Sequence, residues 1–348
     1  MRKVLKTAIC LTALLAGVQV AGVQVYAADL TDKQRLGKRL FFDQGLSEPA
    51  GQSCGSCHLP RAGFADPNRN IPVSEGVIAG RFGNRNTPSA AYASFTPGFT
   101  DLAIGAIGGQ FWDGRAPNLT EQAKGPFLNA VEMNNTSEAQ VVTKVENAAY
   151  ARLFESVYGP NAFANIDVAY NNIADAIAAY ENSHELNPFA SKFDRVQQGL
   201  ETFTAQEQQG LDLFTGRARC SICHTIDSRT VVFSDHRYHN IGLPKNREFP
   251  MGNNPVDLGL GAITNSQADN GRFKTPTLRN ISVTAPYMHN GVLKTLSDVV
   301  SFYNIRDSGA FGQPEVANNI NNVIGDLQLT ADEEVAIVAF LRSLRDEP

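Results

Sequence analysis

The sequence predicts an all-α protein with two domains and long ordered loops. Three observations support this fold class. The chain of 348 residues is long enough to bury two cores, its apolar residues recur at helical spacing behind capping residues, and no stretch argues for an extensive sheet. Composition changes between residues 184 and 199, where Pro188 lies. We therefore place the two domains at residues 28–186 and 187–348.

Residues 1–27 have the features of a cleaved secretory signal peptide. Three basic residues precede an apolar run over residues 8–25, and a plausible cleavage site closes the run near Ala27. A membrane anchor is the alternative, but glycines and glutamines interrupt the run. No later stretch is apolar enough to span a bilayer.

The motif Cys-x-x-Cys-His occurs twice, at residues 54–58 and 220–224. This spacing is the acceptor for a c-type haem, in which each cysteine sulfur bonds the haem and the histidine binds iron. A zinc site or a redox disulfide would also use paired cysteines, but neither requires a histidine directly after the second cysteine in both copies. The motifs predict two covalent haem c groups, held by Cys54, Cys57, His58, Cys220, Cys223 and His224.

The cysteine content and the net charge indicate where the protein is located and which partners it can bind. The fifth cysteine, Cys10, lies in the predicted signal peptide, so no structural disulfide is available. Bacteria attach c-type haem outside the cytoplasm, which agrees with export and predicts the periplasm. The formal net charge is −5, and loss of the signal peptide removes three more positive charges. Nucleic acid is therefore excluded as a partner, whereas a protein with a basic docking face would fit.

The first domain is expected to begin with a helix behind a capping box at residues 31–34, which leads into the first haem motif. Residues 59–100 are rich in glycine, proline and asparagine and predict an ordered loop over the haem. A cap at Ser137 predicts one helix whose apolar stripe runs from Val141 to Phe154. A second helix has its stripe between residues 169 and 180.

The second domain repeats this order. A capping box at residues 204–207 opens a helix that leads into the second haem motif, although the intervening sequences share little. Residues 225–273 are again loop-like. A helix capped at Thr295 places Leu296, Val299, Val300 and Tyr303 at i, i+3, i+4 and i+7, so that Tyr303 faces inward. An amphipathic helix capped at Thr330 closes the chain.

Several segments together resemble the bacterial di-haem cytochrome c peroxidases and, within that superfamily, the MauG-type enzymes. The resemblance covers nearly the whole mature chain. It implies two cytochrome-c-like domains with haems that face a shared interface, in an enzyme that acts on hydrogen peroxide. The segments are GKRLFFD at 37–43, GQFWDGRA at 109–116, EQAKGPF at 121–127, VEM at 131–133 and TPTLRNISVTAPYMHNG at 275–291.

The resemblance also implies roles for single residues. Trp112 matches a tryptophan that relays electrons between the haems, although a buried core aromatic is the ordinary fate of a lone tryptophan. Glu132 matches the acid/base of the peroxide-binding haem, with Gln122 and Pro126 in the same pocket. An interdomain calcium ion is implied as well, with oxygen ligands from Asn86, Thr284 and Pro286.

Two departures favour the MauG type. Peroxidases of this superfamily often close the first haem with a loop histidine, but residues 59–111 contain none, so the first iron should be open. The methionine that binds the second iron in those enzymes is replaced by Tyr303. An anionic phenolate favours higher oxidation states and lowers the haem potential. Alternatively, Tyr303 only packs in a core and Met288 or Met251 binds the iron.

The sequence therefore predicts a peroxidase that forms a high-valent dihaem state and oxidises a tryptophan or tyrosine of a partner protein. The first alternative is a cytochrome c peroxidase that reduces hydrogen peroxide to water with electrons from a small cytochrome c or a cupredoxin. The second is a dihaem electron carrier without catalysis, which would need both irons closed by two ligands.

Overall fold

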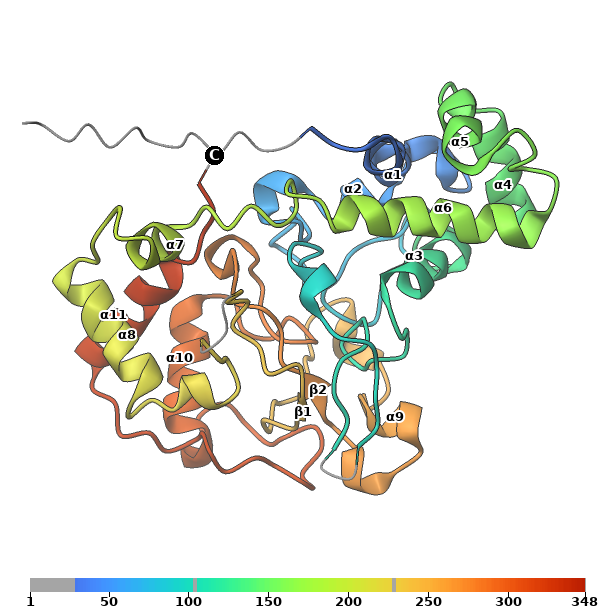
Figure 1. Cartoon of the computed structure of the whole chain (residues 1–348). Helices are drawn as coiled ribbons and strands as arrows, with labels where there is room; N and C mark the ends of the chain where they lie inside the picture. The colour runs from blue at the N-terminus through green and yellow to red at the C-terminus, as the bar shows by residue number, and fades with distance from the viewer. Residues whose placement is uncertain (1–28, 103–104, 227–229, 348) are drawn as a thin grey trace, which may run out of the picture.

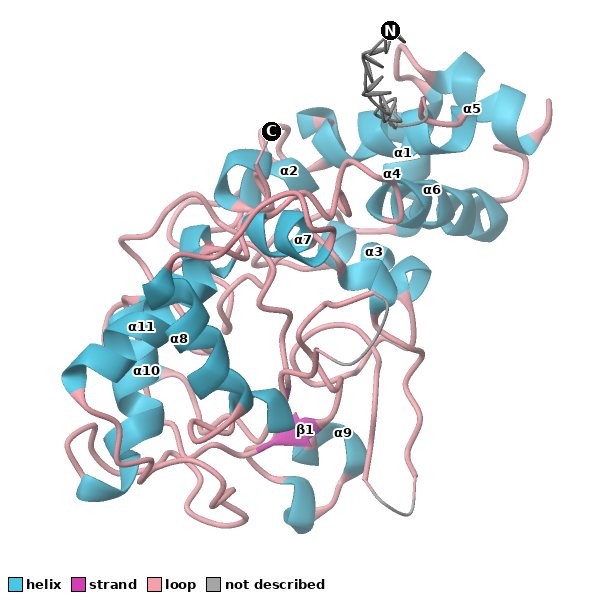
Figure 2. Cartoon of the chain, turned by 60° about the vertical axis from the view of Figure 1, so that its left-hand side comes forward, coloured by secondary structure: helices cyan, strands magenta, loops and turns pink. Residues whose placement is uncertain are grey.

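The computed structural model describes residues 29–102, 105–226 and 230–347, so the predicted signal peptide lies outside the described residues. Helices and loops make up almost all of this part, and the predicted all-α class is confirmed (Figures 1 and 2). Two two-residue strands, β1 (Tyr238–His239) and β2 (Phe273–Lys274), pair antiparallel. The helices are α1 (Asp32–Phe42), α2 (Cys54–Cys57), α3 (Leu119–Leu128), α4 (Glu138–Glu146), α5 (Ala151–Tyr158), α6 (Ile166–Glu181), α7 (Lys192–Gln197), α8 (Ala205–Thr215), α9 (Gly261–Thr264), α10 (Leu296–Ile305) and α11 (Ala331–Arg342).

Each half contains a pair of crossed helices that meet at a glycine. Helix α1 crosses α6 at Gly37, where any Cβ would overlap the carbonyl group of Ala176 and meet the Cβ of Tyr180 at 2.9 Å. Helix α8 crosses α11 at Gly210, where a Cβ would overlap the carbonyl group of Ala336 and meet the Cβ of Phe340 at 2.8 Å. The two crossings, α1 with α6 and α8 with α11, are therefore equivalent (Figure 1). In this equivalence Tyr180 corresponds to Phe340.

The loops after the haem motifs also repeat. Phe64 and Phe233 follow the first and second motifs and both adopt left-handed backbone, with φ of 57° and 56°. The hydroxyl of Ser89 donates to Gly63 O at 2.6 Å, and that of Thr277 donates to Val232 O at 2.7 Å. These hydroxyls belong to the segments 87–89 (TPS) and 275–277 (TPT). The two loops thus repeat a Thr-Pro dipeptide, within intervening sequences expected to share little.

Two hydrophobic cores form around the crossed helices. The first includes Leu36, Phe154 and Leu186, and the second begins at Phe193 and includes the buried face of α11. Val232 is an exception, since it follows the second haem motif but packs in the first core. The boundary predicted between residues 186 and 187 stays a prediction, and it lies between these two sets of core residues. None of the described helices is long and apolar enough to span a membrane.

The predicted caps account for most helix starts. Reciprocal capping boxes open α1, α8, α10 and α11, at the threonines that the sequence indicates. The single helix expected from Val141 to Phe154 is wrong, because α4 ends at Glu146 and α5 starts at Ala151. Asn147 ends α4 by donating its backbone N–H to the carbonyls of Thr143 and Val145, and the chain then turns.

Candidate functional site

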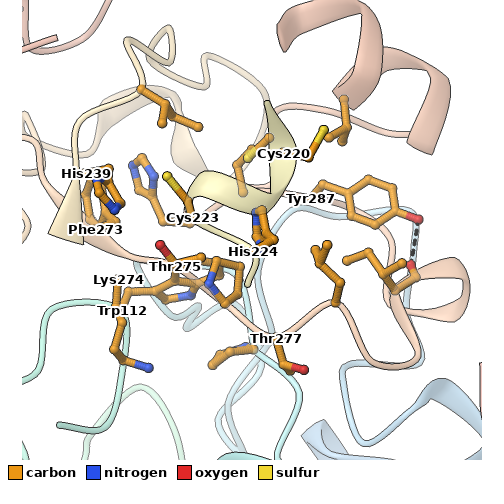
Figure 3. Close-up of a pocket in the computed structure, with 18 of the residues that line it drawn as sticks. Trp112, Cys220, Cys223, His224, His239, Phe273, Lys274, Thr275, Thr277 and Tyr287 are labelled. Carbon is orange, nitrogen blue, oxygen red and sulfur yellow. Dashed lines mark hydrogen bonds between the residues drawn. The ribbon is translucent and has the colours of Figure 1, made fainter. Parts of the chain in front are cut away.

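The second haem motif lies against a large cavity that several elements line. Cys220, Cys223 and His224 reach it from the loop after α8, and Tyr303 reaches it from α10 (Figure 3 labels the first three). The His224 Nδ1 atom lies 2.8 Å from the carbonyl oxygen of Phe233. A carbonyl can only accept a hydrogen bond, so Nδ1 carries the proton and Nε2 is left to bind a metal. Burial lowers the pKa of His224, which keeps the imidazole neutral and able to bind iron.

Tyr303 lines the cavity of the second haem motif. Its ring packs against the second core, but its hydroxyl makes no hydrogen bond within the described part of the chain. Burial raises the pKa of Tyr303, and the neighbouring sulfurs of Cys220 and Cys223 act in the same direction. A phenol near both haem-binding sulfurs, without a protein partner, is a suitable oxygen donor for ferric iron, and iron coordination would offset the raised pKa.

The two alternative methionine ligands differ in position. Met288 lines the same cavity as Tyr303. Met251 is buried outside it, where its sulfur lies 3.4 Å from the side-chain nitrogen of Asn254. Met288 therefore remains the alternative ligand to Tyr303.

The first haem motif forms the short helix α2 and presents its histidine in the same way. His58 Nδ1 lies 3.0 Å from the carbonyl oxygen of Phe64, which leaves Nε2 to bind iron. Burial lowers the pKa of His58 as it does for His224. The side chain of Gln52 donates to Glu75 O at 2.9 Å and lies 3.7 Å from the sulfur of Cys57. Both motifs thus hold the neutral tautomer that a haem requires.

Glu132 lies beside the first motif, in the turn that follows α3. Burial raises the pKa of Glu132, while a hydrogen bond of 2.8 Å from Asn129 and the charge of Arg115 oppose this shift. The carboxylate of Glu132 in turn raises the pKa of both Cys54 and Cys57. A carboxyl group in this position, with a pKa moved toward neutrality, suits proton transfer at the first haem.

Gln122 and Pro126 both lie on α3, one helical turn apart, and so share a face of that helix. The Pro126 carbonyl accepts a hydrogen bond of 3.2 Å from the backbone of Met133, which joins α3 to the turn that contains Glu132. The structure therefore places both residues on the element that supports Glu132.

Trp112 connects the two halves. Its indole N–H donates to Asn86 O at 2.8 Å, and its own carbonyl accepts from the Lys274 backbone N–H at 2.9 Å. Asn86 and Lys274 each directly precede one of the repeated Thr-Pro segments, 87–88 and 275–276. Trp112 is thus tied to equivalent positions of the two haem domains and lines the cavity of the second (Figure 3).

The three candidate calcium ligands, Asn86, Thr284 and Pro286, line the same cavity. The Asn86 side-chain nitrogen donates to Pro72 O at 2.9 Å, which leaves its oxygen free to bind a cation. The backbone carbonyls of Thr284 and Pro286 accept no hydrogen bond from the residues described. Such a set of neutral oxygens matches what calcium binds.

Sequence reasoning missed several charged residues near the cavity. His239 lines it and bonds to Asp235 at 3.0 Å, and Arg85 joins Asp113 (2.5 Å) to Asp257 (2.7 Å). The motifs contain no signal for these pairs, because their partners are distant in the sequence or lie in loops without periodicity. The buried Nε2 atom of His289 has no hydrogen-bond partner in the described structure, and its ring stacks on Phe273 with centroids 3.5 Å apart.

The chain is similar to known proteins over most of its length. Residues 31–202 match the di-haem cytochrome c peroxidase family. The chain is 40% identical to the methylamine utilization protein MauG of Paracoccus denitrificans, over 97% of this chain and 95% of that protein. The chain belongs to the di-haem cytochrome c peroxidase family. It is also 34% identical to the cytochrome c551 peroxidase of Pseudomonas aeruginosa, over 90% of this chain and 79% of that protein.

A solved structure agrees with this family. The diheme peroxidase BthA of Burkholderia thailandensis superposes with a TM-score of 0.84 at 32% identity, over 92% of this chain and 87% of that one. Membership implies two c-type haems, and the two motifs present the ligands that such haems need. The protein is therefore a peroxidase, an oxidoreductase that acts on hydrogen peroxide.

Proposed function

We propose that this di-haem peroxidase uses hydrogen peroxide to oxidise a tryptophan or tyrosine residue of a partner protein. The observation that carries the proposal is Tyr303, an unpartnered phenol that lines the cavity of the second haem. Oxygen ligation there lowers the haem potential and favours stored oxidising equivalents over simple electron delivery. The two haems, held by the cysteines and histidines of the two motifs, would supply peroxide cleavage and storage of the two oxidising equivalents.

The chain's own residues have separate tasks in this reaction. Glu132 moves a proton from the near to the far oxygen of the bound peroxide, which makes water the leaving group. Gln122 and Pro126, both on α3, would shape the pocket in which Glu132 acts. Trp112 lets the two haems share the oxidising equivalents, since it bonds to both halves. The partner therefore docks at the protein surface and does not enter the haem pocket.

The proposal extends to the location of the enzyme, the charge of its partner and a bound calcium ion. A signal peptide cleaved near Ala27 would place the mature protein in the periplasm, where the net negative charge suits a partner with a basic face. We also assign one calcium ion to Asn86, Thr284 and Pro286. This ion would join two segments of the chain. One contains Asn86, whose carbonyl accepts the Trp112 hydrogen bond, and the other contains Thr284 and Pro286, after the second Thr-Pro dipeptide.

Tyr303→Phe tests the proposal directly. The holoprotein is treated with hydrogen peroxide and followed by absorption, Mössbauer and paramagnetic resonance spectroscopy. The variant should keep both haems but fail to form the shared high-valent state. Tyr287→Phe is the matched control, since Tyr287 lines the same cavity but its hydroxyl donates to Ile281 O at 3.0 Å. A shared state that survives in Tyr303→Phe would contradict the proposal.

The competing function is a cytochrome c peroxidase, and the 34% identity to cytochrome c551 peroxidase supports it. That enzyme would take electrons from a small cytochrome c or a cupredoxin, with Met288 in place of Tyr303 on the second iron. Rapid, peroxide-dependent oxidation of such a donor, without modification of any exported protein encoded beside this gene, would favour this alternative.

A further inference from the structure

Glu181 is a buried carboxyl group that the reaction described above does not use. It is the last residue of α6 and only 5% exposed. Its Oε2 atom has no hydrogen-bond partner in the described structure, and burial raises the pKa of Glu181 to about 8. A buried carboxyl group without a partner is costly to the fold, so its presence calls for a functional explanation.

The internal repeat shows what Glu181 faces. Tyr180 corresponds to Phe340 in the equivalent helix crossings, so the next residues, Glu181 and Leu341, correspond as well. Leu341 lines the cavity of the second haem motif, together with Ile337 one turn earlier. Glu181 therefore holds, at the first haem motif, the position that an apolar side chain holds at the second.

The electrostatics of the first motif agree with this placement. The pKa of Cys54 is raised chiefly by burial, and the negative charge of Glu181 is the next largest cause. The carboxyl group thus lies close to a sulfur that bonds the first haem.

Among the described residues, the neighbouring charges do not compensate the negative charge of an ionised Glu181. Glu132 also acts on Cys54 but is negative itself, so it cannot stabilise an ionised Glu181. No described residue supplies a cation that bonds to Glu181. The lysines on the helices that pack against α6 are all paired elsewhere: Lys33 with Asp175, Lys38 with Glu185, Lys124 with Glu121 and Lys144 with Glu48.

We propose that Glu181 is the proton-exchanging residue of the first haem. As a carboxylate it takes up one proton from water when that haem accepts one electron from a reductant, and as a carboxylic acid it releases the proton when the electron leaves. The proton uptake keeps the net charge of this low-dielectric region constant and so stabilises the reduced haem, whereas the ionised carboxylate stabilises the oxidised haem. The inference concerns the first haem alone and does not depend on the partner that the enzyme oxidises.

Redox titration at several pH values tests this role. The midpoint potential of the high-spin haem should fall as pH rises around pH 8, with a limiting slope of tenfold in the equilibrium constant, or about 59 mV, per pH unit. Glu181→Gln should remove this dependence while both haems stay attached. Glu185→Gln is the matched control, because Glu185 lies at the same helix end but is paired with Lys38, and it should keep the wild-type slope. A Glu181→Gln protein with the wild-type slope would overturn the proposal.

A second measurement does not depend on how well the variant folds. The infrared difference spectrum between oxidised and reduced wild-type protein should contain the carbonyl band of a carboxylic acid that gains its proton on reduction. The band should persist in Glu132→Gln, which removes the neighbouring buried carboxyl group. A wild-type spectrum without any redox-linked carboxylic acid band would also refute the role of Glu181.

Discussion

The two haem domains share a frame but differ in the side chains that surround the haem. In both, a glycine allows two helices to cross. A phenylalanine with left-handed backbone then supplies the carbonyl that orients the histidine. The residue before that phenylalanine accepts a hydrogen bond from the hydroxyl that follows a Thr-Pro dipeptide. The frame therefore fixes the attachment and the tautomer of the proximal ligand. It does not decide what the iron does.

The two domains differ in the side chains that this shared frame places near each haem motif. The first domain has two buried carboxyl groups near its motif, Glu132 and Glu181, and its loop has no histidine to close the iron. The second has the apolar Leu341 where the first has Glu181, and it adds the phenol of Tyr303. On the proposed function, the first site would move protons and the second would hold oxidising equivalents.

The largest effect is expected at the first haem, for Glu132→Gln. Loss of a positioned acid/base should slow the reaction with peroxide by about 10²- to 10⁴-fold. The wild-type rate should rise with pH through a pKa above the ordinary value for glutamate, because burial raises that pKa and only the ionised form accepts a proton. Stopped-flow absorption measures both effects.

Glu121→Gln serves as the control for this prediction. Glu121 lies on the adjacent helix α3, where it pairs with Lys124 on the surface. Peroxide kinetics that are unchanged in Glu132→Gln, or equally slowed in Glu121→Gln, would remove Glu132 from the mechanism.

The second domain should be the more sensitive to loss of a buried ion pair. Arg279, only 1% exposed, makes two bonds to Asp194, at 2.5 and 2.8 Å, and the equivalent residue of the first domain is Ala91. Arg279→Leu should cost about 3–5 kcal/mol, since it leaves Asp194 buried and unpaired. Denaturant unfolding of the holoprotein measures this loss.

The same ion pair predicts an acid-labile second domain. Arg279 and Ser191 together hold the pKa of Asp194 below its ordinary value, against the opposing effect of burial. A depressed carboxylate pKa contributes stability that is present at neutral pH and disappears as pH falls through the folded-state pKa. Wild-type stability should therefore fall at acid pH more steeply than that of Arg279→Leu, and parallel pH profiles would contradict this.

Sequence reasoning reached the parts of the site that chemistry fixes tightly. Covalent haem attachment tolerates one spacing, and capping boxes mark helix starts locally, so both could be predicted. Glu181 could not, because its sequence position on α6 looks like one more polar residue at a helix end. Its proposed place beside the first haem follows only from the equivalence of two helix crossings, in which Tyr180 packs against Gly37 as Phe340 packs against Gly210. The repeated Thr-Pro segments were visible in the sequence, but two or three residues carry too little pattern to indicate a repeat.

Calcium removal sharpens the comparison where the domains meet. If Asn86, Thr284 and Pro286 bind calcium, saturation at a hundred times Kd stabilises the holoprotein by about 2.7 kcal/mol. A chelator should lower the thermal midpoint accordingly and alter the high-valent spectrum, because Asn86 also accepts the Trp112 hydrogen bond. Metal analysis with and without the chelator checks the binding. A protein that contains no calcium as purified and gains no stability from added calcium would exclude the site.

The smallest effects should come from the shared frame. Ser89→Ala and Thr277→Val each remove one hydroxyl that bonds a carbonyl in equivalent loops, and each should cost about 1 kcal/mol. Equal losses in chemical denaturation would support the structural repeat. A loss confined to one domain would show that the two loops are not equivalent in energy.

The central claim is that the second iron binds the oxygen of Tyr303 while the first iron stays open. Anaerobic redox titration of the wild-type holoprotein, followed by absorption and paramagnetic resonance, tests it most directly. The account predicts one high-spin and one low-spin haem, both at low potential, without a sulfur-to-iron charge-transfer band. A clearly positive potential for the low-spin haem, accompanied by the methionine-to-iron band, would contradict it.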